Sequence, residues 1–288
     1  ENSLMPNIEI EYSYGPEKLD PIYTGKVTTD KNGFAKIKVK GRKEPGFTTV
    51  KVWTNHNGKK YQNMTNIGYE PYEIEPTTTL PEDFKEFWDN ELAKAAKVPM
   101  LTRVEYVAEQ SDDKVDVYNV RVQSYKRGNY IYGVLSVPKS EGKKAAILRL
   151  PGAAVRSFSG PNSLAYEGFI VFEIGVHGIP VDHDPEMYRA LSSGPLGGYA
   201  TIGLEDKNTF YYKRVYLGCV RAIDYLCSRE DVDSERIAVY GGSQGGMLSI
   251  VTAALDKRVS AMVCYFPAFC DVTGYYYGQL LAMRGWAY

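Results

Sequence analysis

The alternation of apolar and polar residues divides the chain into a front part with strand patterns and a longer part with a mixed pattern. The alternating runs of the front part cover residues 8–14, 25–40, 48–54 and 59–67. Asn32-Gly33 interrupts the second run and Asn57-Gly58 separates the last two, and Asn-Gly at such places is typical of hairpin turns. Residues 1–75 are therefore predicted to form a small all-β, sandwich-like domain. Because a sandwich of this kind needs about seven strands, we expect this domain to be partial.

From residue 76 onward the pattern indicates strands that alternate with helices. The predicted elements cover residues 84–95, 115–124, 130–137, 145–152, 169–175, 211–228, 236–255 and 259–267. The runs 145–152 and 169–175 are almost continuously apolar, which is typical of strands covered on both faces. An antiparallel start followed by alternating strands and helices predicts an α/β-hydrolase fold rather than a Rossmann fold, in a domain of residues 76–288. We expect this sheet to be incomplete, without its last strands.

Composition excludes several classes of partner. The 34 basic and 35 acidic residues of the 288 give a net charge of −1, which argues against nucleic acid as the main partner. No apolar run reaches the about 18 residues that a membrane span needs. The chain opens without Met or an apolar leader, so any targeting signal is expected to have been removed or omitted. The four cysteines are too few for a disulfide scaffold and are predicted to be small buried side chains.

A single motif carries recognisable chemistry. The segment GGSQGG (241–246) contains G-x-S-x-G between an apolar strand and a helix, which is the context of a nucleophile elbow. A serine at such a turn needs a strained backbone, and Gly241 and Gly245 must lack side chains because strand and helix approach closely there. Ser243 is therefore the predicted nucleophile, and the backbone N–H of Gln244 is a predicted oxyanion donor.

A second oxyanion donor is expected from the loop after an earlier strand of the same sheet. The apolar run 145–150 ends in Pro151-Gly152-Ala153, where glycine lets the turn approach the elbow. The backbone N–H of Ala153 is the predicted second donor.

Several blocks of the chain resemble the acetyl xylan esterase/cephalosporin-C deacetylase family of α/β-hydrolases. They are EDFKEFWDNELAKAAKVP, NTFYYKRVYLGCVRAIDYLCSREDVDSERIAVYGGSQGG and AALDKRVSAMVCYFPAFCD, in the family's order and spacing between about residues 76 and 271. The resemblance implies a serine esterase that removes acetyl groups from xylan, oligosaccharides or similar small esters through an acyl-enzyme, without metal or organic cofactor. It also implies Ser243 as nucleophile, with Gln244 and Ala153 as the oxyanion hole.

The chain departs from the family pattern in two loops. The family's His-Gly-Tyr reads Pro151-Gly152-Ala153 here, so a tyrosine side chain in the acyl pocket is lost. The family's Arg-Gly-Gln-Gly reads HGIP (177–180). This variant and the β-rich front part are more similar to the multidomain bacterial branch that degrades polysaccharides, which implies a periplasmic or extracellular protein. The pattern leaves a homo-oligomer open.

The sequence does not supply the usual partners of the nucleophile. In this fold the triad follows the order Ser, acid, His, yet the three histidines, His56, His177 and His183, all precede Ser243. His177 and His183 are candidates for lining the pocket, and a metal site built on 182–184 is not expected. Asp256 and Asp271 do not fit the position of the acid. We therefore expect the acid and the base to lie beyond Tyr288, and the chain alone to be inactive.

Two other functions remain open at this stage. A prolyl-oligopeptidase-like peptidase also has a glycine-rich elbow, but it carries tyrosine after the serine and a larger β-domain in front. A non-catalytic carbohydrate-binding protein on a hydrolase scaffold would use exposed tyrosines as stacking platforms. The candidate platforms are Tyr199, Tyr211, Tyr212 and residues 275–277.

Overall fold

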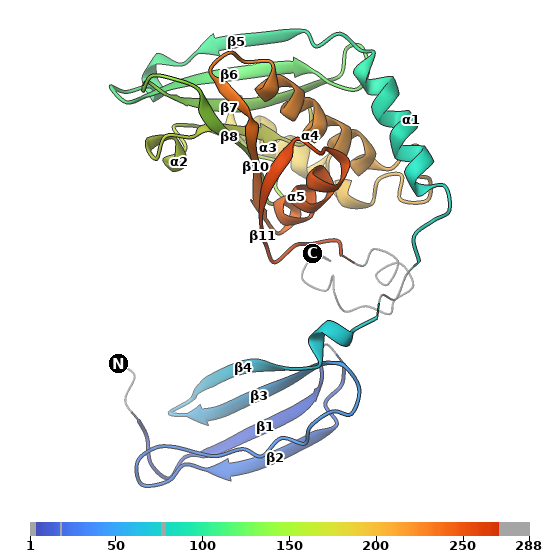
Figure 1. Ribbon diagram of the computed structural model, residues 1–288. Helices are drawn as coiled ribbons and strands as arrows, with labels where there is room; N and C mark the ends of the chain where they lie inside the picture. Colours follow the sequence, from blue (N-terminus) through green and yellow to red (C-terminus); the bar gives the residue numbers. More distant parts are fainter. Residues whose placement is uncertain (1–3, 18, 76–78, 271–288) are drawn as a thin grey trace. The chain divides into compact units, whose positions relative to one another are not determined.

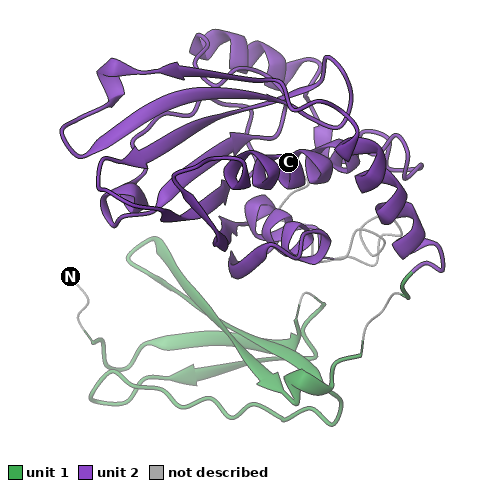
Figure 2. Cartoon of the chain, turned by 45° about the horizontal axis from the view of Figure 1, so that its top comes forward, with its two compact units in different colours: residues 1–80, 271–288 green, residues 81–270 purple. Residues whose placement is uncertain are grey.

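The computed structural model describes residues 4–17, 19–75 and 79–270. They form two compact units, one on each side of the step from Leu80 to Pro81 (Figure 2). This step lies close to the boundary predicted after Glu75. Within the described part of the chain, no helix is both long enough and apolar enough to cross a membrane.

The first unit is one antiparallel sheet of four strands in the order β2-β1-β3-β4 (Figure 1). Its strands are β1 (Glu9–Pro16), β2 (Tyr23–Thr28), β3 (Gly46–His56) and β4 (Lys59–Tyr69), followed by the short 3-10 helix η1 (Pro71–Glu73). The predicted all-β structure is thus observed. The described residues of this unit form one sheet and not the two packed sheets of a sandwich.

The two Asn-Gly turns of the first unit have different outcomes. Asn57 and Gly58 both have positive φ angles, 51° and 74°, and His56 pairs with Lys59, so the predicted tight hairpin is present. The turn at 30–33 is present too, as shown by the hydrogen bond of 2.9 Å that the Gly33 N–H donates to the Asp30 carbonyl. The run 34–40 after it is not a strand, however, although its alternation predicted one. A strand needs a partner for its backbone groups, and β2 pairs with β1 instead.

The second unit is built on a seven-stranded sheet in the order β11-β10-β8-β9-β7-β6-β5. Its strands are β5 (Thr102–Tyr106), β6 (Val115–Gln123), β7 (Tyr130–Pro138), β8 (Lys144–Leu150), β9 (Ile170–Gly175), β10 (Val232–Gly242) and β11 (Val259–Tyr265). The helices are α1 (Phe84–Ala96), η2 (Ala108–Gln110), α2 (Ser163–Tyr166), α3 (Pro185–Ser193), η3 (Tyr199–Thr201), α4 (Tyr211–Cys227) and α5 (Gln244–Leu255). Pairs β5–β6, β6–β7 and β7–β9 are antiparallel and the others are parallel, which is the predicted α/β-hydrolase arrangement. Strand β5 and helices α2 and α3 were not predicted.

The sheet is covered on both faces, as the continuous apolar runs predicted. Even-numbered residues of β9, such as Ile170 and Phe172, belong to the large core shared with α4 and α5. Val171 points to the opposite face, where it packs with Ala165 of α2. All six residues of β9 are buried, so this central strand has no face in contact with water.

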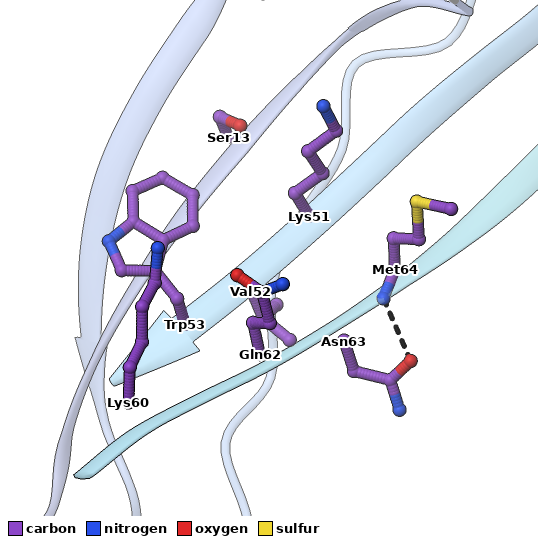
Figure 3. Close-up of a pocket in the computed structure, with 8 residues that line it drawn as sticks. All are labelled: Ser13, Lys51, Val52, Trp53, Lys60, Gln62, Asn63 and Met64. Atoms are coloured by element: carbon purple, nitrogen blue, oxygen red, sulfur yellow. Dashed lines mark hydrogen bonds between the residues drawn. The ribbon is translucent and has the colours of Figure 1, made fainter. Parts of the chain in front are cut away.

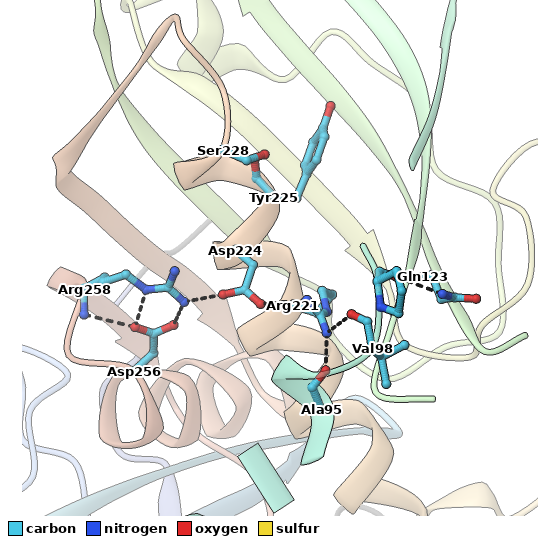
Figure 4. A network of polar contacts seen from close by, with 10 residues as sticks. Ala95, Val98, Gln123, Arg221, Asp224, Tyr225, Ser228, Asp256 and Arg258 are labelled. Carbon is cyan, nitrogen blue, oxygen red and sulfur yellow. Dashed lines mark hydrogen bonds and ion pairs between the residues drawn. The ribbon is translucent and has the colours of Figure 1, made fainter. Parts of the chain in front are cut away.

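Ion pairs fix the C-terminal half of α4 to its neighbours (Figure 4). Arg221 donates to the Ala95 carbonyl at the end of α1 and pairs with Asp224 at 3.1 Å. Asp224 also pairs with Arg258 at 2.6 Å, and Arg258 pairs with Asp256 after α5 at 2.6 Å. The carboxylates hold the pKa of Arg258 above its usual range, chiefly through the hydrogen bonds that its side chain donates to Asp256. The network therefore joins three helices at this end of the sheet.

Candidate active site

Ser243 lies at the turn between β10 and α5 in a conformation that L-residues rarely adopt. Its φ and ψ angles are 56° and −120°. Its N–H donates to the Tyr265 carbonyl at 3.1 Å and its carbonyl accepts from the Ala268 N–H at 3.0 Å. The end of β11 and the segment after it thus hold the turn from one side, and strain of this kind persists only where the surroundings fix it.

Close backbone contacts explain why the motif has glycine at positions 241 and 245. A Cβ atom on Gly245 would lie 2.1 Å from the Leu150 carbonyl oxygen. One on Gly241 would lie 2.5 Å from the Gly245 carbonyl oxygen. Helix α5 therefore lies too close to strands β8 and β10 for a side chain at either position, as the motif predicted.

The two predicted oxyanion donors come from neighbouring strands. Gly241 of β10 is in register with Leu150 of β8, so the loop that begins at Pro151 starts beside the elbow. Gln244 opens α5, and the first N–H groups of a helix have no partner within it. Among the described residues, the Ala153 N–H has no hydrogen-bond acceptor. Both donors are thus free on the same edge of the sheet, and their catalytic role stays a prediction.

The Gln244 side chain has surroundings that the sequence did not reveal. It is fully buried, and its Oε1 accepts hydrogen bonds from Tyr199 Oη at 2.6 Å and Tyr212 Oη at 2.7 Å. Its Nε2 donates to the Pro151 carbonyl at 3.2 Å. A buried glutamine beside the nucleophile is thereby bonded to the loop of the second oxyanion donor.

His177 is buried beside the same loop. Its Nδ1 lies 2.6 Å from Tyr211 Oη, and its Nε2 lies 3.0 Å from the Ala154 carbonyl oxygen. Burial lowers the pKa of this imidazole, and the nearby charge of Arg214 lowers the pKa further. Since both ring nitrogens are engaged, His177 is not available as the base for Ser243.

His183, the other candidate for lining the pocket, lies elsewhere on the unit. It is exposed and borders a groove together with Arg103, Asn119 and Asp182, and Ser243 is not a residue of that groove. The Asp182 carboxylate accepts a hydrogen bond from Asn119, and Asp184 caps the start of α3. Throughout the described residues no group of three or more His, Cys, Asp or Glu is placed to hold a metal ion.

The tyrosines near the site are core residues. Tyr199, Tyr211 and Tyr212 are at most 8% exposed, and their rings contact one another. Burial raises the pKa of Tyr199 to about 12 and raises the pKa of Tyr211 as well. These three side chains therefore cannot serve as exposed sugar-stacking platforms, because the packed core covers their faces. Residues 275–277 lie outside the described part of the chain.

The acid and base of a catalytic triad are not found among the described residues. Asp256 follows the far end of α5, a helix of 12 residues and about 18 Å long, and is engaged with Arg258. Asp271 lies outside the described residues. His56 belongs to β3 of the first unit. The candidate site as described consists of the predicted nucleophile and the two predicted oxyanion donors.

Two further features carry none of the predicted site residues. A hollow on the sheet of the first unit is bordered by Trp53, Lys51, Lys60 and Gln62 (Figure 3).

All four cysteines are free; Cys219 is buried as predicted, and burial raises the pKa of its thiol to about 12. Cys270, in contrast, is exposed.

Comparison with known proteins gives a consistent result. Residues 69–276 match the acetyl xylan esterase (AXE1) family. The chain is 38% identical over 277 residues to acetyl esterase Axe7A of Xylanibacter ruminicola, an alignment that covers 94% of this chain and 62% of that protein. The chain therefore spans about three fifths of the length of this curated relative.

Two solved structures resemble the chain. An acetyl xylan esterase from Paenibacillus sp. R4 has a TM-score of 0.60 and 32% identity, covering 73% of this chain and 69% of that one. Acetyl xylan esterase 1 from Thermoanaerobacterium sp. JW/SL YS485 has a TM-score of 0.55 and 27% identity, covering 65% of this chain and 59% of that one. Both likenesses agree with the hydrolase arrangement of the sheet.

Proposed function

Because this chain belongs to the acetyl xylan esterase (AXE1) family of α/β-hydrolases, we propose that it removes acetyl groups from acetylated xylan or related oligosaccharides. The observation that carries the proposal is Ser243, held at a positive φ of 56° between β10 and α5, with the N–H groups of Gln244 and of Ala153 in the loop after β8 as the nearby candidate donors. This strained backbone conformation is the one that a nucleophile elbow requires, and it persists only where the surrounding structure holds it.

The proposed reaction proceeds in two steps. Ser243 Oγ attacks the acetyl carbonyl carbon and passes its proton to a base, and the N–H groups of Gln244 and Ala153 bind the oxyanion. The ester C–O bond breaks, the sugar hydroxyl leaves with a proton, and an acetyl-serine remains. Water then attacks this intermediate, acetate leaves and the Ser243 hydroxyl is restored. The base and its carboxylate are the parts of this mechanism that the described residues do not supply.

The test is acetate release from 4-nitrophenyl acetate and from acetylated xylo-oligosaccharides by the full chain, meaning the natural protein with any residues encoded beyond Tyr288, because residues 1–288 alone are expected to be inactive. Ser243→Ala is expected to lower kcat by about 10⁴-fold or more, because the covalent route is lost. Ser249→Ala is a matched control, since Ser249 is buried in the same helix and its hydroxyl bonds only the Gly245 carbonyl. Equal activity of the Ser243 variant and the natural chain would refute the serine mechanism.

Export from a bacterial cell is proposed on the nature of the substrate. Xylan is a polymer too large to enter the cytoplasm, so an enzyme that deacetylates the polymer has to meet it outside. Cell fractionation with an antibody against this chain tests the proposal, and recovery in the cytoplasm alone would contradict it.

A further inference from the structure

The loop that carries the Ala153 N–H has no regular structure, yet buried side chains hold it on both sides of that group. Gln244 Nε2 is bonded to the Pro151 carbonyl at 3.2 Å, two residues before Ala153. His177 Nε2 is bonded to the Ala154 carbonyl at 3.0 Å, one residue after it. The peptide that presents the donor therefore lies between two anchored carbonyl groups.

The chemistry of these bonds fixes how each anchoring side chain is oriented. A backbone carbonyl can only accept, so the Gln244 amide must present its NH₂ group to Pro151 and its oxygen to the tyrosines. For the same reason His177 must carry its proton on Nε2, which leaves Nδ1 to accept from the Tyr211 hydroxyl at 2.6 Å. Burial keeps this imidazole neutral by lowering its pKa.

Tyrosines from η3 and from the first turn of α4 complete each anchor. Tyr199 and Tyr212 both donate to Gln244 Oε1, and Tyr211 donates to His177. Each polar atom of the two anchoring side chains thus has a partner of the right kind. A satisfied, buried network of this type is rigid, because moving any member leaves a polar group without a hydrogen bond.

We propose that Gln244 and His177 are positioning residues which clamp the loop 151–154 and so set the Ala153 N–H for oxyanion binding. The proposal rests on the proposed function, since it assigns these side chains to the same esterase reaction. Gln244 thereby has two separate parts, a backbone N–H that binds the oxyanion and a side chain that places the other donor. Positions of such donors matter because catalytic groups must be held within about 0.5 Å of the productive geometry.

The first test replaces the Gln244 side chain while its backbone N–H is kept. In the full chain, Gln244→Met should lower kcat for 4-nitrophenyl acetate about 10- to 100-fold, with KM within about twofold, because an oxyanion donor acts in the transition state. The rate at which a fluorophosphonate labels Ser243 should fall similarly. Hydrogen exchange in the peptide 150–156 should become faster. Thr252→Val, which removes another buried hydroxyl of α5, should leave all three measurements unchanged.

The second test uses His177, which lies outside the elbow and its helix. His177→Leu should lower kcat and speed exchange in 150–156 as Gln244→Met does. His177→Gln should restore most of both, because its amide nitrogen reaches as far as Nε2 and can donate to Ala154. If His177 contributed only to stability, His177→Leu and His177→Gln would have equal effects, and neither would lower kcat per folded molecule.

The outcomes separate this proposal from the esterase proposal. If the natural chain labels at Ser243 and releases no acetate, the acetyl esterase activity is refuted, while labelling and exchange still test the clamp. If Gln244→Met folds and exchange in 150–156 does not change, the clamp is refuted whatever the substrate is. Faster exchange with an unchanged labelling rate refutes it too, because the loop would then move without affecting the oxyanion site.

Discussion

The two ends of helix α4 are both fastened by polar side chains, but by different kinds. At its start, Tyr211 and Tyr212 form uncharged hydrogen bonds with His177 and Gln244. Ten residues further on, Arg221 begins the ion-pair network that reaches α1 and the end of α5. The first end lies beside the candidate active site and the second does not.

The difference follows from access to water. Tyr212 and Gln244 are essentially unexposed, whereas the side chains of Asp224 and Arg258 are 30% and 41% exposed. A charge far from water costs several kcal/mol unless it is fully paired, so the deep network uses neutral groups. The ion-pair network at the other end can use charges because Asp224 and Arg258 keep contact with solvent, and because its buried members, Arg221 and Asp256, are paired with them. Neutral, directional bonds also define positions without adding a field to the oxyanion site, so we expect the first end to govern catalysis and the second to govern stability.

The largest effect is expected from crowding the catalytic end. Gly245→Ala places a Cβ atom 2.1 Å from the Leu150 carbonyl oxygen, so strand β8 or helix α5 must shift. We expect a loss of about 3 kcal/mol or more in the free energy of unfolding, together with the loss of esterase activity. Urea unfolding and 4-nitrophenyl acetate hydrolysis measure the two. In Gly152→Ala the nearest backbone atom would be 3.9 Å away, so its stability should stay within about 0.5 kcal/mol. Equal stability of the two variants would show that the close approach is not real.

The next largest effect is expected from removing Arg221, the buried arginine of the ion-pair network. Arg221→Met removes a buried guanidinium, so the Val98 carbonyl and one Asp224 oxygen lose its hydrogen bonds, while the Ala95 carbonyl keeps the bond from the Val98 N–H. The expected cost is about 2–3 kcal/mol in urea unfolding, and kcat per folded molecule should not change. Arg189→Met on α3, where the ion pair is exposed, should cost less than about 0.5 kcal/mol. A large fall in kcat of the Arg221 variant would erase the contrast between the two ends.

The exposed part of the ion-pair network should matter less. Arg258→Met removes two ion pairs, to Asp224 and to the buried Asp256, but the arginine is 41% exposed and its backbone N–H still donates to Asp256, so we expect about 1–2 kcal/mol at low salt. In 1 M NaCl, where the Debye length is about 3 Å, that difference should shrink, while the loss in Arg221→Met persists. A salt-independent effect at Arg258 would place its charge deeper than its exposure indicates.

The smallest effect concerns pH at the catalytic end. Burial lowers the pKa of His177 in the folded chain, so the unfolded chain binds its proton more readily. The stability that neutral His177 contributes is fully present above the unfolded pKa of about 6.5, and is lost as pH falls toward the folded pKa. Between pH 7 and 5, the unfolding free energy of His177→Gln should therefore decline less than that of the natural chain. His183→Gln, at an exposed position, should follow the natural chain, and identical slopes for all three would contradict the burial of His177.

Much of the hydrolase unit was predictable from local patterns. The strands β6 to β11 and helix α4 were predicted within a few residues, because continuous apolar runs and helical spacing report burial directly. The family was also identified correctly. Strand β5 was missed because every one of its residues is exposed, so its sequence carries no burial pattern. The run 34–40 was predicted wrongly because alternation cannot show whether a partner strand is available.

In the candidate site, too, local patterns predicted some residues and gave no signal for others. The motif predicted Ser243 and the glycines, since strain and close backbone contact demand those residue types at fixed spacing. The Gln244 side chain carried no such signal, because a glutamine after a serine reads as an ordinary polar residue. The sequence suggests His177 as a residue that lines the pocket and the tyrosines as exposed platforms. The structure instead buries all of them together around one loop.

The sequence by itself determined the hydrolase unit, its family and the elbow motif that makes Ser243 the candidate nucleophile, because these depend on patterns that neighbouring residues carry. Only the tertiary structure decided that one hydrogen-bonded network beside the loop 151–154 contains Tyr199, Tyr211, Tyr212, His177 and Gln244. Their bonds join residues up to 93 positions apart. Hydrogen bonds need contact within about 3 Å, and contact between distant residues arises only when the chain has folded.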